Sequence, residues 1–376
     1  MKVKLYPSRL QGIVSAPDSK SLLHRHLICQ ALAGEFLAPA EVSDDVKHTV
    51  QGLSALYHGE KQINCGMSGS TLRFLLPLAM ARGQAGVTFT GDPHLLERPM
   101  HAPLPMERTA QGWQVMGKLL PGTYRLAAHE TSQLISGLLM ALPLLDKPSK
   151  IMLTSDAVSQ PYIDMTIAVM AQHGVVVEKN HLGYAVSAPQ TYQKAEFFGE
   201  GDWSAAAWYV VMNALQGGGI TVENTVLPSL QGDSCVMNYV NSNSSEIDIS
   251  QTPDLLPPLA LWAALQAGKT TRFIRAGFLR RKESDRLHNT AQILNAFGAE
   301  VQEEEDGLRV FGVADLCGGA EADACRDHRM VMLAAFAGTL CHQPVLLTGA
   351  EFVDKSYPNF WRDYAALGGK MEVIEP

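Results

Sequence analysis

One pattern of apolar and polar positions recurs along the chain: side chains at helical spacing, then a glycine, then a short strand-like run. The three copies are residues 163–179 with Gly174, residues 287–303 with Gly298, and residues 364–374 with Gly368 and Gly369. A glycine just after a helix commonly supplies the left-handed conformation that ends it, and β-branched residues favour a strand. The pattern therefore predicts helix and strand units that repeat along the chain.

In the first two copies, a polar turn leads on to a second strand-like run, at residues 185–187 and 308–311. A helix followed by a hairpin cannot bury its apolar face alone, so the repeat predicts an α/β chain with several small sheets and helices packed inside. Glycine between helix and strand is common in α/β proteins, so unrelated αβ segments are the alternative interpretation.

Composition narrows the class of protein. A chain of 376 residues exceeds one ordinary core and predicts two or three domains. With 46% hydrophobic and 18% charged residues it can bury a large core, which argues against a disordered chain. The net charge of −8 argues against general nucleic-acid binding, because phosphate affinity comes from clustered basic residues. No stretch is long and apolar enough for a membrane span, and we expect a cytoplasmic protein.

Cysteine and histidine spacing gives little support for a disulfide framework or a metal site. The six cysteines are dispersed without a CxxC pair, which favours reduced thiols. His24 and His26 form an HxH without a further ligand at a recognisable spacing, and we interpret them as histidines of a helix. We expect no metal and no cofactor.

Two polar segments precede apolar helical runs. In residues 17–21, Lys20 lies where free N–H groups at a helix start favour an anion, although taken alone the segment fits an ordinary capped surface helix better. In residues 65–81, Gly66 and Gly69 flank a turn without the signature of a P-loop or a dinucleotide site. This turn indicates either close backbone approach to a small ligand or a simple helix entry.

Two further segments are rich in charge. Lys282 and Arg286 fall one helical turn apart in residues 280–287, a run that usually marks a solvated face. Residues 326–330 place Arg329 and His328 directly before an almost wholly apolar helix. His328 either orients its neighbours or simply packs.

Ten short motifs in this order resemble the 5-enolpyruvylshikimate-3-phosphate synthase family. They are SKS with Arg25, SGST with Arg73, ERP at 97–99, TSQ at 131–133, SQPYID at 159–164, GEGDWS at 199–204, TPD at 252–254, RKESDRL at 281–287, DHRM at 327–330 and DKSYP at 354–358. The resemblance implies a transferase of the shikimate pathway, which leads to chorismate and the aromatic amino acids. The implied reaction moves the enolpyruvyl group of phosphoenolpyruvate to the 5-hydroxyl of shikimate 3-phosphate and releases phosphate.

The resemblance also implies an architecture of two similar lobes, each built of three small αβ units, of the inside-out α/β barrel type. Residues 1–13 and 200–376 would form the C-terminal lobe on the phosphoenolpyruvate side. Residues 14–199 would form the N-terminal lobe on the shikimate 3-phosphate side, with the ligands between the lobes. The expected partners are these two small molecules alone, and the expected state is a monomer.

Matching the motifs residue by residue implies the ligand contacts. Phosphoenolpyruvate would be held by Lys20, Gly69, Arg98, Gln133, Arg286, Arg329 and Lys355. Shikimate 3-phosphate would be held by Lys20, Ser21, Arg25, Thr131, Ser132, Gln133, Ser159, Tyr162, Asp254 and Lys282. The two ligands together carry roughly five to six negative charges. The seven cations among these residues come close to balancing that charge.

The catalytic candidates are Asp254, Glu283 and Lys20. The reaction needs a base for the 5-hydroxyl proton and an acid for the methylene carbon, and two carboxylates among cations suit both tasks. We assign the base to Asp254 and the acid to Glu283, with Lys20 as a partner in proton transfer; the division of roles between the carboxylates stays open.

Three positions depart from the common family pattern, namely Asp18, Met67 and Gln160. None of them removes a charged catalytic candidate, so we expect an active enzyme. Two alternatives are an enolpyruvyl transferase acting on UDP-N-acetylglucosamine and a catalytically inactive relative that binds a phosphoester.

Overall fold

The structure is a computed structural model that describes residues 1–129, 131–197, 199–242 and 244–375. The chain divides into two compact units. Unit 1 comprises Met1–Asp18 and Glu200–Pro376, and unit 2 comprises Ser19–Gly199. The sequence placed the first boundary near residue 13, whereas the structure keeps the chain in unit 1 up to Asp18. Asp18 forms a bridge with Gly201, and the Asp202 amide donates to the Pro17 carbonyl at 2.7 Å, which holds both ends of this boundary in unit 1.

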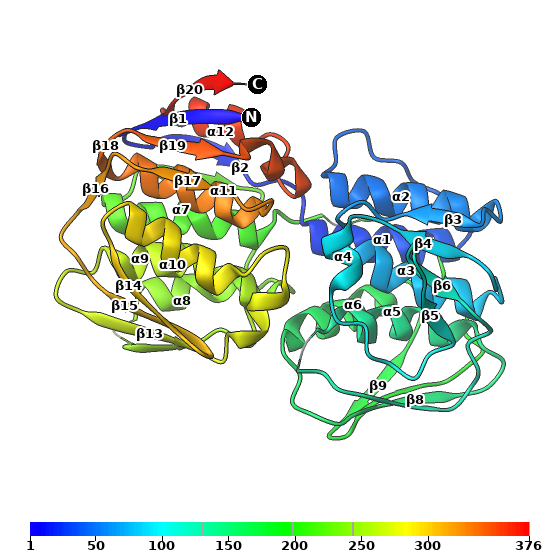
Figure 1. Cartoon of the computed structure of the whole chain (residues 1–376). Helices are drawn as coiled ribbons and strands as arrows, with labels where there is room; N and C mark the ends of the chain where they lie inside the picture. Colours follow the sequence, from blue (N-terminus) through cyan, green and yellow to red (C-terminus); the bar gives the residue numbers. More distant parts are fainter. Residues whose placement is uncertain (130, 198, 243, 376) are drawn as a thin grey trace. The chain divides into compact units, whose positions relative to one another are not determined.

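The described residues of unit 2 form helices and two four-stranded sheets, and Figure 1 shows these elements. Its helices are α1 (Lys20–Leu32), α2 (Asp44–Tyr57), α3 (Gly69–Ala81), α4 (Pro93–Glu97), α5 (Gln133–Ala141) and α6 (Gln160–Gln172), with a 3-10 turn η1 (Leu142–Leu144). Its strands are β3 (Gln62–Asn64), β4 (Thr88–Thr90), β5 (Met106–Arg108), β6 (Trp113–Val115), β7 (Thr123–Leu126), β8 (Ser149–Leu153), β9 (Val177–Asn180) and β10 (Gly183–Val186).

Unit 1 contains the remaining elements. Its helices are α7 (Trp203–Gln216), α8 (Val236–Val240), α9 (Leu256–Ala264), α10 (Arg286–Ala296), α11 (His328–Thr339) and α12 (Phe360–Ala366). Its 3-10 turns are η2 (Gly232–Cys235), η3 (Pro253–Leu255), η4 (Gly277–Arg281) and η5 (Ala350–Lys355). Its strands are β1 (Lys2–Tyr6), β2 (Gly12–Ser15), β11 (Ile220–Glu223), β12 (Glu246–Asp248), β13 (Thr270–Ile274), β14 (Glu300–Glu304), β15 (Gly307–Phe311), β16 (Leu316–Gly318), β17 (Glu321–Asp323), β18 (Cys341–Gln343), β19 (Val345–Thr348) and β20 (Lys370–Glu375).

The four-stranded sheets of the described residues share one topology. Their strand orders are β3-β4-β6-β5, β7-β8-β10-β9, β12-β13-β15-β14 and β17-β19-β1-β20. In each sheet the first pair is parallel and the next two pairs are antiparallel. The repeated strand order corresponds to the repeated helix, glycine and strand pattern of the sequence, whose copies supply β9, β14 and β20, each the last strand of its sheet. Within the described chain, two four-stranded sheets fall in each unit, while β2 with β11 and β16 with β18 form short parallel pairs in unit 1.

In the last of these sheets the third position is filled by β1, from the start of the chain. Val3 lies opposite Leu347 of β19 and opposite Val373 of β20, so β1 is a central strand with both sides paired. Figure 1 shows this strand in blue beside the red C-terminal elements. The first strand of the chain is therefore part of unit 1.

The helix, glycine and strand pattern is confirmed at its three positions. Gly174, Gly298 and Gly368 have φ of 77°, 100° and 94° and follow α6, α10 and α12, and the strands β9, β14 and β20 come next. A β-carbon is strained at such angles, which explains the glycine. In the first copy the strand begins at Val177, so the first two valines of the run precede it.

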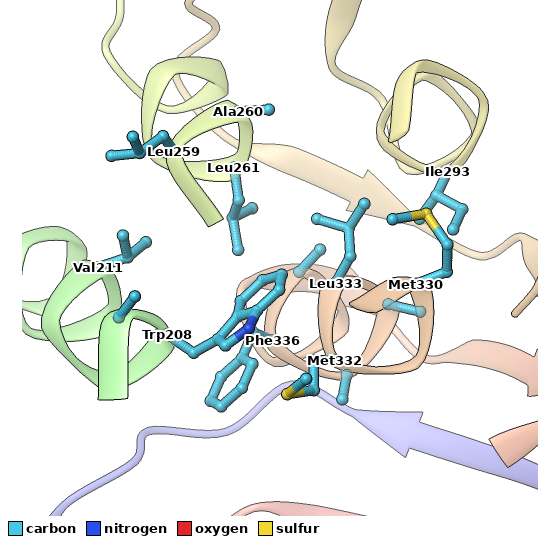
Figure 2. Close-up of a cluster of buried hydrophobic side chains, with 14 of the residues drawn as sticks. Trp208, Val211, Leu259, Ala260, Leu261, Ile293, Met330, Met332, Leu333 and Phe336 are labelled. Carbon is cyan, nitrogen blue, oxygen red and sulfur yellow. The ribbon is translucent and has the colours of Figure 1, made fainter. Parts of the chain in front are cut away.

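The core of unit 1 lies among its helices. Every residue of α11 is buried, which explains its almost wholly apolar sequence. Trp208 of α7 stacks on Phe336 of α11 with ring centroids 5.4 Å apart. Figure 2 shows these rings beside Leu261 of α9 and Leu333 of α11. Among the described residues, no helix combines the length and the apolar character that crossing a membrane requires.

Candidate functional site

A group of closely spaced charges in unit 1 surrounds Arg286. This side chain is only 2% exposed, and its guanidinium donates to three carboxylates. The distances are 2.6 Å from Nη1 to Asp254, 2.7 Å from Nη2 to Glu283 and 2.8 Å from Nε to Asp327. A buried arginine with several carboxylate partners is fixed in position, because its planar donors match carboxylate oxygens.

Asp254 bridges two arginines. Its Oδ1 accepts from Arg286, and its Oδ2 accepts from Nη2 of Arg329 at 2.9 Å. Burial would raise the pKa of Asp254, but the charges of Arg329 and Arg286 outweigh it and hold that pKa well below its ordinary value. Lys282 adds to the same lowering of the pKa. Asp254 is therefore an ionised carboxylate at neutral pH.

Glu283 connects this group to the segment near the C-terminus. Its Oε2 accepts from Arg286, and its Oε1 lies 3.6 Å from Nζ of Lys355. The Glu283 side chain is 13% exposed and that of Lys355 is 5% exposed. Glu283 thus keeps access to solvent while two cations hold it.

Helix caps explain why these residues converge. Asp285 caps α10 by accepting from the His288 amide, which places Arg286 in the first turn. Asp327 caps α11 by accepting from the Arg329 amide at 2.9 Å, while its other oxygen binds Arg286. Aspartate is a preferred N-cap, so the local sequence sets both helix starts.

Two more ionisable residues lie beside Arg329 and Asp327. Arg329 donates to the Ser204 carbonyl at 2.9 Å, and Asp233 hydrogen-bonds Ser204. Burial and then the charge of Asp254 raise the pKa of Asp233 to about 7. His328 is buried, with Nδ1 3.6 Å from the Asp327 carboxylate, so it packs against the capping group.

In unit 2, Lys20 forms an ion pair with Asp45. The Nζ lies 2.9 Å from Oδ2, and the side chains are 16% and 6% exposed. Sequence reasoning missed Asp45, because Asp44 and Asp45 both look like ordinary acids at the start of a helix. Only the packing of α2 distinguishes the buried Asp45 from the exposed Asp44.

Besides Lys20, unit 2 has two arginines, Arg73 and Arg98, beside the start of α3. A β-carbon on Gly69 would lie 2.9 Å from Nη1 of Arg73, 3.1 Å from Oε1 of Gln133 and 3.2 Å from Nη1 of Arg98. Gln133 accepts from Arg73 at 3.2 Å and donates to the Ser70 hydroxyl at 3.2 Å. The structure brings together Gly69, Arg98 and Gln133, and it adds Arg73. Two arginines at a helix N-terminus suit an anion.

Arg25 lies inside unit 2, between α1 and α6. Each of its nitrogens donates to a protein acceptor: Thr166 Oγ1 at 2.7 Å, the Ser21 carbonyl at 2.6 Å and the Tyr162 carbonyl at 3.0 Å. Burial lowers its pKa to about 10. Arg25 therefore fixes the two elements that carry Ser21 and Tyr162.

The remaining predicted residues of unit 2 lie at helix starts. Ser132 is the N-cap of α5, and the Thr131 hydroxyl accepts from the Gln133 amide at 3.2 Å. Ser159 is the N-cap of α6 and has a left-handed backbone with φ of 56°. Among the residues that the structure describes, no group of three or more His, Cys, Asp or Glu side chains is arranged to hold a metal ion.

Comparison with known proteins gives consistent matches. A family model described as EPSP synthase (3-phosphoshikimate 1-carboxyvinyltransferase) matches residues 37–242 and 234–364. A protein of Clostridium kluyveri named 3-phosphoshikimate 1-carboxyvinyltransferase is 37% identical over 421 residues, covering 98% of each chain. One of the same name from Clostridioides difficile is 34% identical, also with 98% of each chain covered. A solved EPSP synthase structure from Acinetobacter baumannii has a TM-score of 0.76 at 22% identity and covers 100% of both chains.

Proposed function

The chain belongs to the EPSP synthase family. We propose that it transfers the enolpyruvyl group of phosphoenolpyruvate to the 5-hydroxyl of shikimate 3-phosphate, releasing phosphate. The full-length relatives named 3-phosphoshikimate 1-carboxyvinyltransferase support this acceptor. Transfer to UDP-N-acetylglucosamine is not favoured by these matches. The proposed activity makes the chain a transferase of the shikimate pathway, serving chorismate and aromatic amino acid synthesis.

The observation that carries the proposal is the network in which the buried Arg286 and Arg329 bind the partly buried Asp254 and Glu283. Two arginines fixed by carboxylates form a preorganised site for a planar carboxylate or a phosphate. The same carboxylates supply groups for proton transfer. A protein that only bound a phosphoester would need the cations but not the two acids held among them, so the intact network supports an active enzyme.

The chemistry assigns a task to each carboxylate. The 5-hydroxyl oxygen attacks C2 of phosphoenolpyruvate and gives its proton to Asp254, while Glu283 delivers a proton to the methylene carbon. The resulting tetrahedral adduct then loses phosphate, and one proton of the new methyl group passes to the carboxylate of Glu283, which restores the double bond. Lys20, paired with Asp45, takes part in proton transfer.

Anionic substrates would change the basicity of Asp254. In the structure both of its oxygens bind arginines, which holds its pKa low and makes it a weak base. A substrate phosphate or carboxylate that engages Arg286 and Arg329 would add negative charge and take over part of their donors. The pKa of Asp254 would rise as a result, so the base would become stronger when the substrates are bound.

Both units contribute ligand contacts in this proposal. Unit 1 would form the phosphoenolpyruvate side through Arg286, Arg329 and Lys355, and unit 2 the shikimate 3-phosphate side. The two sets overlap, because Lys20, Gly69, Arg98 and Gln133 of unit 2 would also contact phosphoenolpyruvate. We propose further that the protein acts as a monomer in the cytoplasm and needs no cofactor.

Phosphate release from the two substrates tests the activity. We expect the purified chain to release phosphate with shikimate 3-phosphate as acceptor and not with UDP-N-acetylglucosamine. A folded protein without turnover would contradict the proposal, and turnover with the UDP-sugar alone would favour the alternative.

Glu283→Gln tests the assignment of the acid. The variant keeps the size of the side chain and an oxygen for Arg286, so calorimetry should still detect binding of shikimate 3-phosphate. The rate should fall by roughly 10²- to 10⁴-fold, the usual contribution of general acid–base catalysis. Glu300→Gln, at an exposed position of β14, is the matched control and should turn over normally. A wild-type rate for Glu283→Gln would show that another group is the acid.

A further inference from the structure

A buried chain of polar side chains joins three helices of unit 2. Nδ1 of His24 lies 2.8 Å from the Thr49 hydroxyl, which lies 2.7 Å from the Thr71 hydroxyl, which lies 2.8 Å from the Ser68 hydroxyl. These side chains come from α1, α2 and α3 and the N-cap of α3, and all four are buried. Buried polar groups cost free energy unless they are hydrogen-bonded, so this chain specifies how the three helices meet.

Thr71 is the junction of the chain. Its hydroxyl contacts Thr49 and Ser68, and it also lies 3.3 Å from the carbonyl oxygen of Asp45. Its backbone amide donates to the Ser68 hydroxyl at 3.2 Å. One side chain therefore links the start of α2 to the start of α3.

Both helix starts carry groups of the proposed site. The carboxylate of Asp45 holds Lys20, and Ser68 immediately precedes Gly69. Thr71 itself is fully buried, so its influence on a ligand must pass through these neighbours.

We propose that Thr71 is a positioning residue for phosphoenolpyruvate binding. Its hydroxyl fixes the start of α3 at Gly69 against the start of α2 at Asp45, and so sets the spacing between the Gly69 turn and the ammonium group of Lys20. This inference rests on the proposed function and refines it.

The number of hydrogen bonds that a hydroxyl can make explains why one is needed at this junction. A threonine hydroxyl donates one hydrogen bond and accepts two. The three oxygen neighbours of Thr71 use that full capacity. Valine has the same shape but would leave Thr49, Ser68 and the Asp45 carbonyl without this partner, whereas serine would keep the hydroxyl.

Steady-state kinetics of Thr71→Val test the proposal. We expect KM for phosphoenolpyruvate to rise about tenfold, the effect of roughly one lost hydrogen bond, with kcat changed about twofold at most. Thr71→Ser should stay within about twofold of the wild type in both constants, because it restores the hydroxyl. Should the valine variant not fold, Thr71→Ala takes its place with the same expected rise in KM.

Thr339→Val is the matched control. Thr339 is a buried threonine of unit 1 whose hydroxyl makes two bonds of 2.8 Å, to the Ala335 carbonyl and the Tyr364 hydroxyl. Its loss should lower thermal stability without changing KM. Equal changes in KM for Thr71→Val and Thr339→Val would overturn the positioning role, as would a serine variant as impaired as the valine variant.

Calorimetry with phosphoenolpyruvate in the presence of shikimate 3-phosphate separates this inference from the proposed function. A wild-type chain that neither binds nor turns over these substrates refutes the proposed function and this inference with it. A wild-type chain that works, together with a Thr71→Val variant that binds phosphoenolpyruvate equally well, refutes the positioning role alone.

Discussion

Replacing Asp327 by asparagine tests how the arginine network of unit 1 is held. Asp327 is fully buried; its Oδ1 caps α11 through the Arg329 amide, and its Oδ2 accepts from Arg286 at 2.8 Å and from the Ser284 hydroxyl at 3.1 Å. Asparagine has the same size and is also a preferred N-cap. Asp327→Asn therefore removes the charge while keeping the cap.

The expected cost follows from what remains around Arg286. Stripping a buried charge of its partner typically costs about 3–5 kcal/mol. Arg286 keeps Asp254 and Glu283 in the variant, at 2.6 and 2.7 Å. The loss should therefore be that of one hydrogen bond to a charged group, about 1.5–3 kcal/mol of unfolding free energy.

Urea unfolding followed by tryptophan fluorescence measures this loss. The signal reports mainly on unit 1, which contains every tryptophan except Trp113. Asp315→Asn is the control, because Asp315 forms an exposed pair with His342 and should change the unfolding free energy by less than about 1 kcal/mol. An Asp327→Asn variant as stable as this control would refute the reasoning. A loss above about 5 kcal/mol would mean that Asp254 and Glu283 do not compensate Arg286.

Three further predictions concern single side chains. In Gly137→Ala the new β-carbon would overlap the backbone carbonyl of Arg73, so α5 must move away from α3. The free energy of unfolding should fall by about 1–3 kcal/mol, measured by thermal unfolding. An unchanged unfolding midpoint would contradict this packing. Asp233 keeps its proton up to about pH 7 in the folded state but only to about 3.8 when unfolded, so its contribution to stability is lost as pH rises through this range. Urea midpoints at pH 5 and pH 8 should therefore differ less for Asp233→Asn than for the wild type, and an identical difference would show that Asp233 does not titrate there. Gly69→Ala should fold normally, because the atom nearest to the new β-carbon is at the flexible end of Arg73. The variant should nevertheless raise KM for phosphoenolpyruvate several-fold. An unchanged KM would show that this ligand binds elsewhere.

Local signals made the repeat predictable from the sequence. A glycine after a helix and a strand-like run after the glycine both act within a few residues, so Gly174, Gly298 and Gly368 could be identified without the structure. The pattern of apolar and polar positions does not indicate that β1 pairs with β19 and β20. Only the resemblance to a family indicated that the first strand joins the C-terminal half.

The site was predictable as a set of motifs but not as a network. The motif at residues 327–330 was found, yet the ion pair of Asp327 with Arg286 depends on how α10 packs beside α11. Asp45 was missed for the same reason, since its neighbour Asp44 has the same local sequence signal. Arg25 was assigned to a ligand by resemblance, and the structure adds that its nitrogens already bind protein carbonyls and a hydroxyl.

The position of β1 at the centre of its sheet has a consequence for synthesis on the ribosome. This strand emerges before unit 2, but its partners β19 and β20 emerge only after nearly all of unit 1 has been made. Unit 2 is one continuous segment and can fold while the chain is still growing. The sheet that contains β1 must instead wait for β19 and β20, so β1 stays unpaired in the nascent chain until these two strands of unit 1 have been made.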